Sequence, residues 1–290
     1  MKNLQEYLRE SNIQKNSFLV NKKLNNKLFS NNKIIVENSS ELQNIIFKRL
    51  DDGITDFSDI DTINVTNMDS LFYTNKFKPE MKSINVTGWN TSKVTSMEIM
   101  FNNCYYLEEI IGIEDWDVSN VTSFSDMFSE CPYLKLDLKD WDVCSGIIFD
   151  SMFSDSPNIN FDVSDWNMYN AVNISLMFSN CKSFEGKGLE EWRTPKLVNM
   201  YKAFSDCENM NADLSNWDVS NLTSLSGTFY NCYKLDFDLS KWKLEKLKTC
   251  VTDPFRNCKS LSCDLSKWKY LKKIFELNKN SFHGCDKCKF

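Results

Sequence analysis

Eight tryptophans divide most of the chain into segments of nearly equal length. They stand at Trp89, Trp116, Trp141, Trp166, Trp192, Trp217, Trp242 and Trp268, with gaps of 27, 25, 25, 26, 25, 25 and 26 residues. A fixed period of this length is typical of repeat proteins, in which each repeat forms one turn of a stack and contacts only its neighbours. The spacing therefore predicts one elongated repeat region rather than several independent domains.

Other residue types recur in register with the tryptophans. A Phe follows the Trp by twelve residues six times in succession, at Phe101, Phe128, Phe153, Phe178, Phe204 and Phe229. Three residues beyond the Phe of each repeat the sequence has Cys104, Cys131, Cys181, Cys207, Cys232, Cys258 and Cys285, with Ser156 in the one remaining repeat. Because one turn alone buries too little apolar surface to fold, we expect these positions to form buried rows between adjacent turns.

The repeat begins before the first tryptophan. Residues 56–72 fit the same pattern with Ile60 in place of Trp, which gives about nine turns, and residues 73–81 form an insertion. Apolar stretches such as 136–138 predict short parallel strands, whereas 126–131 (Asp-Met-Phe-Ser-Glu-Cys) predicts a single helical or 3₁₀ turn. The predicted fold class is thus an α+β repeat solenoid, roughly 40 Å long at one strand spacing per turn.

The recurring series Met-Phe-x-x-Cys-x-x-Leu-x-x-x-Asp-Leu-Ser-x-Trp-Asp-Val-Ser-Asn-Val-Thr resembles the BspA-like leucine-rich repeat family, in particular its mycoplasma-lipoprotein branch of unknown function. The resemblance covers residues 56–290. It implies a right-handed, leucine-rich-repeat-like stack of a kind found on bacterial surface proteins and in phage and parasite genomes. It also implies binding to proteins or host surfaces more often than catalysis.

The first 55 residues lie outside the repeat and form the other predicted unit, so that the two units are 1–55 and 56–290. A short strand at 34–36 is followed by a capping box that begins at Ser40, and by a helix that Gly53 ends. This helix is predicted to place Leu42, Ile45, Ile46 and Leu50 on one face. We interpret it as a cap over the first turn, or as an element that attaches the stack to another protein.

Charge and hydropathy restrict the partner and the location. Residues 1–60 carry a net charge of +1, residues 61–240 carry −15, and residues 241–290 carry +8. An acidic body repels nucleic acid, and no apolar run is long enough to span a membrane. The polar N-terminal sequence does not have the pattern of a secretory signal. We therefore expect a cytoplasmic or virion-associated location rather than the cell surface.

The cysteines are predicted to be structural. One Cys per turn gives a linear row, whereas zinc needs four ligands that converge on one point. We expect the row to be buried and reduced, with each thiol packing as a small apolar group. The pair Cys285 and Cys288 is the sole C-x-x-C motif and is weak evidence for zinc or redox chemistry. Cys144, Cys250 and Cys263 lie outside the row, and we expect them to be partly exposed.

Aspartates also recur, four residues before Trp (Asp137, Asp162, Asp213, Asp238 and Asp264) or directly after it (Asp117, Asp142 and Asp218). Aligned carboxylates are calcium ligands in some β-rolls, but those need a Gly-rich run that is missing from this sequence. We therefore predict that these side chains accept hydrogen bonds from the backbone of turns. His283 is the only histidine, and no phosphate-binding or hydrolase motif occurs. We expect no enzyme activity, no cofactor and no metal.

Tyrosines are the candidate binding residues. They lie between the core positions, at Tyr105, Tyr106, Tyr133, Tyr169, Tyr201, Tyr230 and Tyr233. If they share one edge of the stack they form an aromatic stripe of the kind favoured at protein interfaces; the alternative is scattered, half-buried surface tyrosine.

The predicted function is a non-catalytic protein-binding solenoid that presents an extended surface, first of all its acidic middle turns, to a partner or a host surface. The alternative is a structural component of a phage or other assembly, which self-associates or docks through its N-terminal segment.

Overall fold

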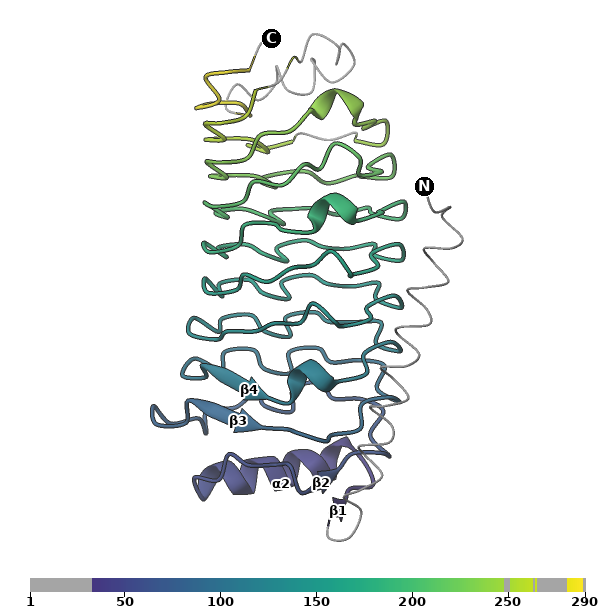
Figure 1. Ribbon diagram of the computed structural model, residues 1–290, viewed down its shortest axis with the longest axis vertical. Coiled ribbons are helices and arrows are strands. Elements are labelled where there is room, and N and C mark those ends of the chain that lie inside the picture. The colour runs from purple at the N-terminus through teal and green to yellow at the C-terminus, as the bar shows by residue number, and fades with distance from the viewer. Residues whose placement is uncertain (1–32, 248–250, 263, 265–280, 289–290) are drawn as a thin grey trace, which may run out of the picture.

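The computed structural model describes residues 33–247, 251–262, 264 and 281–288. Successive segments of the chain lie above one another as coils (Figure 1). Helix α2 (Ser39–Asp51) lies at one end, and the later segments follow in chain order towards the other end (Figure 1).

Neighbouring coils are joined by parallel backbone pairing. Strand β1 (Ile34–Ile35) pairs with β2 (Ile60–Asp61), and β3 (Ser83–Asn85) pairs with β4 (Glu109–Ile111). Farther along, single parallel bridges join the same position of consecutive coils, and we call it the bridge column: Asn67, Ser96, Ser123, Ile148, Asn173, Asn199 and Ser224. The extended pairing is this short because turns flank it on both sides.

The predicted helical turn at Asp126–Cys131 is wrong. Residues 125–130 are turns, and Asp126 and Glu130 both have left-handed backbones, with φ of 54° and 58°. Each such reversal ends the turn before a helix can propagate, and the freed N–H groups bond to the next coil, as Phe128 N does to Met152 O at 2.8 Å. Short 3₁₀ helices occur instead directly before tryptophans, at η1 (Ile113–Asp115), η2 (Leu189–Glu191) and η3 (Leu239–Lys241).

The predicted rows of buried aromatic residues are confirmed. The Phe rings stack from Phe72 to Phe282, with centroids of successive rings 4.9–5.8 Å apart. Trp89 and Trp116 stack in the same way, with centroids 5.9 Å apart and ring planes 4° from parallel. Most indole N–H groups also donate to a carbonyl of the preceding coil at 2.8–3.1 Å: those of Trp89, Trp141, Trp166, Trp192, Trp217 and Trp242. The tryptophans thus combine apolar packing with a bond between coils.

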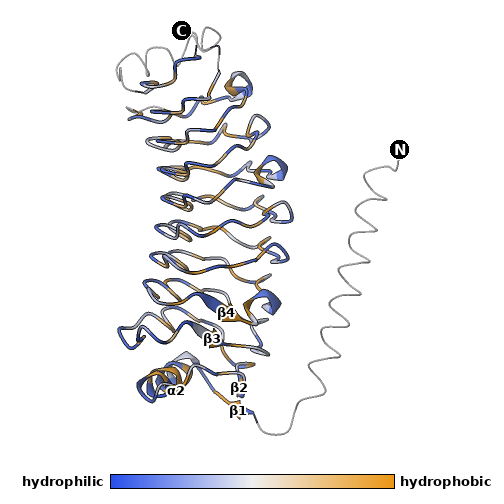
Figure 2. Cartoon of the chain, turned by 60° about the vertical axis from the view of Figure 1, so that its left-hand side comes forward, coloured by the Kyte–Doolittle hydropathy of each residue, from blue (hydrophilic) through white to orange (hydrophobic). Residues whose placement is uncertain are grey.

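Helix α2 covers the first coil. Its N-cap is Asn38, whose side chain accepts from Glu41 N, so the helix begins before the predicted capping box at Ser40. Leu42, Ile46 and Leu50 are fully buried, and the helix shows apolar and polar faces (Figure 2). In addition, Ser39 Oγ donates to Asn67 O, and Gln43 Nε2 donates to Ser70 O at 3.1 Å. Side chains of the helix therefore satisfy carbonyls at the end of the stack, where there is no earlier coil to do so.

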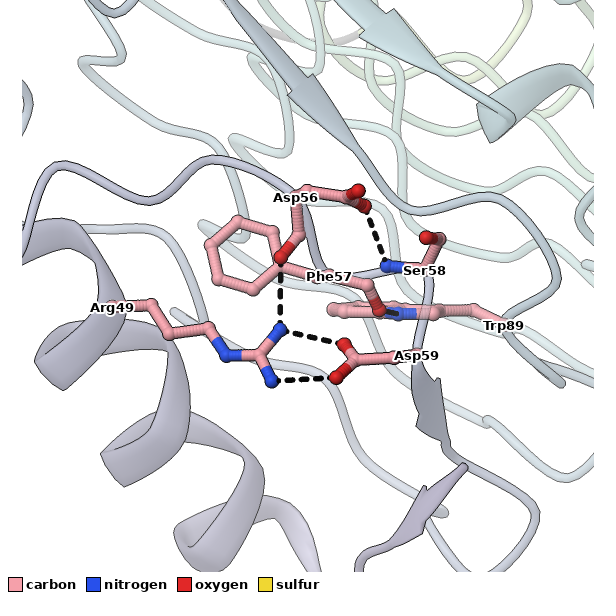
Figure 3. A network of polar contacts seen from close by, with 6 residues as sticks. All are labelled: Arg49, Asp56, Phe57, Ser58, Asp59 and Trp89. Carbon is pink, nitrogen blue, oxygen red and sulfur yellow. Dashed lines mark hydrogen bonds and ion pairs between the residues drawn. The ribbon is translucent and has the colours of Figure 1, made fainter. Parts of the chain in front are cut away.

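An arginine fastens the helix to the chain that enters the first coil (Figure 3). Arg49 donates to Asp56 O at 2.8 Å and to both carboxylate oxygens of Asp59 at 2.6 and 2.9 Å. The hydrogen bond to Asp59 raises the pKa of Arg49, and the same bond lowers the pKa of Asp59. Next to this pair, Phe57 O accepts from Trp89 Nε1, so the contact continues into the core of the following coil.

The insertion at 73–81 adds to this end of the molecule. Phe77 and Met81 are buried, and Lys76 forms an ion pair with Asp51 of α2 at 2.6 Å. Across the described residues, the helices are too short or too polar to cross a membrane.

Candidate protein-interaction surface

The recurrent aspartates are used by the fold, as predicted. In each of seven, one carboxylate oxygen accepts from the backbone N–H two residues later, at 2.9–3.3 Å: Asp117, Asp137, Asp142, Asp162, Asp213, Asp218 and Asp238. Asp264 is exposed. This bond closes an Asx turn at the corner of a coil, and it accounts for the regular spacing of these residues.

The cysteine row is buried and free, as predicted, and it also makes hydrogen bonds that the sequence analysis missed. Each thiol donates to the carbonyl of a Phe one coil earlier, as Cys207 Sγ does to Phe178 O at 2.9 Å. Ser156, which replaces Cys in one coil, makes the equivalent bond to Phe128 O at 2.7 Å. The position therefore selects a small side chain with a hydrogen to donate. The replacement of Cys by Ser was the sequence signal for this requirement.

Burial keeps most thiols of the row protonated; the exception is Cys285, where a hydrogen bond with Cys258 is the main cause that lowers the pKa. Burial raises the pKa of Cys131 to about 12, and it raises the pKa values of Cys104 and Cys181 as well. A protonated thiol is a poor nucleophile and a poor metal ligand. Among the described residues, no group of three or more His, Cys, Asp or Glu side chains is placed to hold a metal ion.

The remaining chemical candidates lie apart from one another. Cys144 is partly buried, and burial is the main cause that raises its pKa. Cys285 is free and continues the row, whereas Cys288 is disulfide-bonded, so the C-x-x-C pair does not offer two free thiols. Cys250 and Cys263 lie outside the described residues. His283 is exposed, and its carbonyl accepts from Asn257 N at 2.7 Å.

The seven tyrosines occupy different positions of the repeat. Tyr105 and Tyr233 follow the repeat Cys by one residue, Tyr106 and Tyr133 follow it by two, and the others lie before it, at Tyr169, Tyr201 and Tyr230. Tyr105, Tyr133, Tyr169 and Tyr201 are exposed, and the remaining three are partly buried. Ring contacts between these tyrosines join Tyr105 to Tyr106 in the same coil and to Tyr133 in the adjacent coil.

Most of these rings carry a cation of the same chain on one face. Lys196 lies over Tyr169, Lys202 over Tyr201, Arg256 over Tyr230 and Lys259 over Tyr233, at 4.8–5.8 Å from the ring centroids. Such contacts hold the rings against the surface of the stack. They give these four tyrosines an intramolecular role.

Three tyrosines form a cluster on adjacent coils, which we call the tyrosine cluster: Tyr105, Tyr106 and Tyr133. The ring of Tyr105 meets that of Tyr106 at 5.3 Å and that of Tyr133 at 5.7 Å, nearly perpendicular in both cases. A hydrogen bond to Tyr133 is the main cause that raises the pKa of Tyr105. Because Tyr105 and Tyr133 remain 49% and 45% exposed, the cluster is an aromatic protrusion rather than part of the core.

An ion pair borders the tyrosine cluster. Lys82 Nζ lies 2.9 Å from Glu108 Oε1 and 5.7 Å from the ring centroid of Tyr133. The hydrogen bond between the two side chains raises the pKa of Lys82 and lowers the pKa of Glu108. Sequence analysis missed both residues. Their signal was the repeat register, since Lys82 and Glu108 precede successive tryptophans by seven and eight residues.

The comparisons with known proteins agree with a repeat region that fills most of the chain. A family model described as a Mycoplasma protein of unknown function, DUF285, matches residues 40–157, 77–190 and 173–289. No curated protein matches the sequence. The three overlapping matches extend from α2 to the last described coil, and the chain therefore belongs to this Mycoplasma repeat family, DUF285.

Proposed function

We propose that the chain is a non-catalytic protein-binding solenoid of the BspA-like, leucine-rich-repeat-like type, with right-handed coils. Two features support the proposal. Backbone, indole and thiol hydrogen bonds connect coil to coil, so the surface side chains are held at fixed spacing. The recurrent Asp and Cys side chains, which carry the chemistry that an active site would use, are engaged in those turns and rows.

The tyrosine cluster is the observation that carries the proposal. Tyrosine supplies large contact area with little loss of conformational freedom, and it is enriched in the residues that dominate binding energy. Among the described residues, no cation covers the faces of Tyr105 or Tyr106, in contrast to Tyr133, Tyr169 and Tyr201. Their rings are therefore available to a partner.

The charge around the cluster indicates the chemistry of that partner. Glu108, Glu109 and Glu130 are exposed on the same coils, and residues 61–240 carry a net charge of −15. A basic protein surface would be steered towards this part of the stack, with an association rate that falls as salt screens the charges. We therefore propose a partner that brings lysine or arginine side chains to the tyrosine cluster.

Binding by wild-type chain and two matched double variants tests this function. The immobilised proteins are exposed to extract of the source cells, and bound proteins are quantified by mass spectrometry. Tyr105→Ala with Tyr133→Ala removes the exposed rings of the cluster. Tyr169→Ala with Tyr201→Ala removes two equally exposed rings elsewhere. We expect the first variant to lose a specific protein at least tenfold and the second to retain it. Equal recovery by both variants, or no protein specific to wild type, would contradict the proposal.

A further inference from the structure

A second exposed surface runs along the coils, beside the bridge column. The residue before each bridge residue is β-branched in every coil of the column, and we call this row the branched column: Thr66, Thr95, Thr122, Ile147, Val172, Val198 and Thr223. Five of its members are exposed, and Val172 and Val198 are half-buried. The bridge and branched columns together are named the ladder face. Its repeat is one coil, about 4.8 Å.

The apolar residues of the ladder face lie at its centre. Ile147 and Ile148 are 41% and 37% exposed, and they belong to the fourth of the seven coils in the column. Thr, Ser and Asn predominate in the coils towards both ends. An apolar centre with a polar rim is the composition of a protein interface. Exposed isoleucines that are scattered singly over a surface would need no explanation, but these two are adjacent and central.

Most polar side chains of the ladder face already donate a hydrogen bond within the chain: Asn67, Thr95, Ser96, Thr122, Ser123 and Thr223. Thr95 and Thr122 hydroxyls donate to Thr66 O and Thr95 O of the preceding coil at 3.3 and 3.1 Å. Ser96 Oγ donates to Asp69 at 2.6 Å, and Ser123 Oγ donates to Glu98 at 2.6 Å. Removal of water from this face therefore costs less than it would if these side chains were hydrogen-bonded only to water.

We propose that two copies of this chain associate through their ladder faces, about a twofold axis parallel to the stack. This axis lies between the two columns, so that each coil faces the same coil of the second copy. The branched column of one copy then contacts the bridge column of the other, and Ile147 meets Ile148 of the second copy. A partner with the same repeat keeps this register along all seven coils, and a second copy has that repeat.

Charges on either side of the columns favour this arrangement. Lys93 lies three residues before its bridge residue, and Glu98 lies two after it, so the twofold axis brings Lys93 opposite Glu98 of the second copy. In the fourth coil, Asp150 lies opposite Ser145. An axis across the stack would instead place the two copies of Asp150 against each other, which costs free energy. The parallel arrangement avoids that repulsion.

The size of the face determines the expected affinity. Seven coils and the five-residue width from Lys93 to Glu98 give about 500 Å² per copy, or roughly 1,000 Å² in total. This area is at the lower limit for a specific interface. We therefore expect a dimer with a dissociation constant in the micromolar range rather than an obligate dimer.

Sedimentation velocity over a concentration series tests the proposal with matched isoleucine variants. Ile147→Lys places a charge at the centre of the face, and we expect it to weaken dimerisation at least tenfold. Ile111→Lys is the control, because Ile111 is also 41% exposed and lies half a coil away. It should dimerise like wild type. A wild-type chain that stays monomeric at hundreds of micromolar, or equal dimerisation of the two variants, overturns the proposal.

A charge exchange tests the direction of the axis. Lys93→Glu is expected to weaken the dimer at low salt, and the double variant Lys93→Glu with Glu98→Lys should restore it. Circular dichroism and thermal unfolding of each variant verify that the coils are intact. If the double variant dimerises no better than Lys93→Glu alone, the parallel arrangement is wrong.

Discussion

The thiol of Cys181 donates a hydrogen bond to the carbonyl oxygen of Phe153, one coil earlier, at 3.0 Å. The same relationship joins Cys232 to Phe204 at 3.0 Å. In these coils, then, a side chain adds to the backbone bonds that join the Phe segment to the next coil, such as Phe153 N to Met177 O at 2.9 Å. Phe153 O and Phe204 O also accept from the backbone N–H three residues later, at 3.1 Å in both cases, so the thiol contributes a second hydrogen bond to each carbonyl as well as packing.

Substitutions at Cys181 should separate these two contributions. Cys181→Ser keeps a donor of similar size, and we expect it to lower the free energy of unfolding by about 1 kcal/mol or less. Cys181→Ala removes the donor and leaves a void, and the Phe153 carbonyl keeps only its bond from Ser156 N at 3.1 Å, so we expect a loss of about 2 kcal/mol. Urea unfolding followed by tryptophan fluorescence measures both. Equal stability of the two variants would mean that the thiol acts by its volume alone.

The stability of the fold should decrease at alkaline pH because of the cysteine row. Burial raises the pKa of Cys131 from 9.0 to about 12, so the folded chain holds this proton over a range in which the unfolded chain releases it. The stabilising effect is complete below pH 9 and is lost as the pH rises towards 12, at about 1.4 kcal/mol per pH unit for one thiol. Comparison of wild type with Cys131→Ser at pH 8 and pH 10 isolates this group. The stability difference between them should shrink by about 1 kcal/mol at the higher pH.

At acidic pH we expect Asp162 to be the informative group. A hydrogen bond from Lys187, 2.9 Å away, is the main cause that lowers the pKa of Asp162 to about 2, and a backbone bond from Ser164 adds to it. Its contribution to stability is therefore present above pH 4 and is lost as the pH falls through 2. Carboxyl NMR titration should show this low pKa, and Lys187→Gln should raise it. Lys182→Gln, which removes a cation paired with Glu208, is the control and should leave Asp162 unchanged.

The sequence and the structure agree best where the side chain itself determines the position. The spacing of Trp, Phe and Cys was sufficient to predict buried rows, because apolar side chains that recur once per coil have nowhere else to pack. The left-handed turns were not predictable in this way. Ile99 and Leu176 have φ of 59° and 58°, although neither residue type favours that conformation. Hydrogen bonds to the next coil impose it, and those bonds are not visible in the sequence.

For the candidate surface, too, the sequence predicted the residue types but not their contacts. Sequence analysis identified the tyrosines, but not which of them are neighbours. The contact between Tyr105 and Tyr133 depends on the fact that the two coils lie directly above one another in register. The cation that lies over Tyr133 comes from Lys82, just beyond the insertion at 73–81. Contacts of this kind depend on the path of the whole coil.

Two glycines should respond very differently to the same substitution. Both have a positive φ, 92° at Gly188 and 79° at Gly53. A Cβ at Gly188 would lie 2.2 Å from Ser164 N in the preceding coil, whereas nothing lies within 4 Å of a Cβ at Gly53. Gly53→Ala should therefore cost about 1 kcal/mol, from backbone strain alone, and Gly188→Ala at least about 3 kcal/mol, because the coils must separate. Thermal unfolding of the two variants measures the difference, and similar melting temperatures would show that the coils move apart easily.

The indole N–H of Trp116 has no hydrogen-bond partner, in contrast to those of six other tryptophans. Trp141 Nε1 donates to Ile113 O at 3.1 Å, but Trp116 Nε1 is buried and has no partner. The gap of 27 residues before Trp116 is the longest between tryptophans. Trp116→Phe removes a buried donor that has no partner. Trp141→Phe instead removes the hydrogen bond to Ile113 O. Trp141→Phe should therefore destabilise the fold by about 1–2 kcal/mol more than Trp116→Phe does. Urea unfolding monitored by far-ultraviolet circular dichroism measures both variants, and the reverse order would show that Trp116 makes a hydrogen bond in solution.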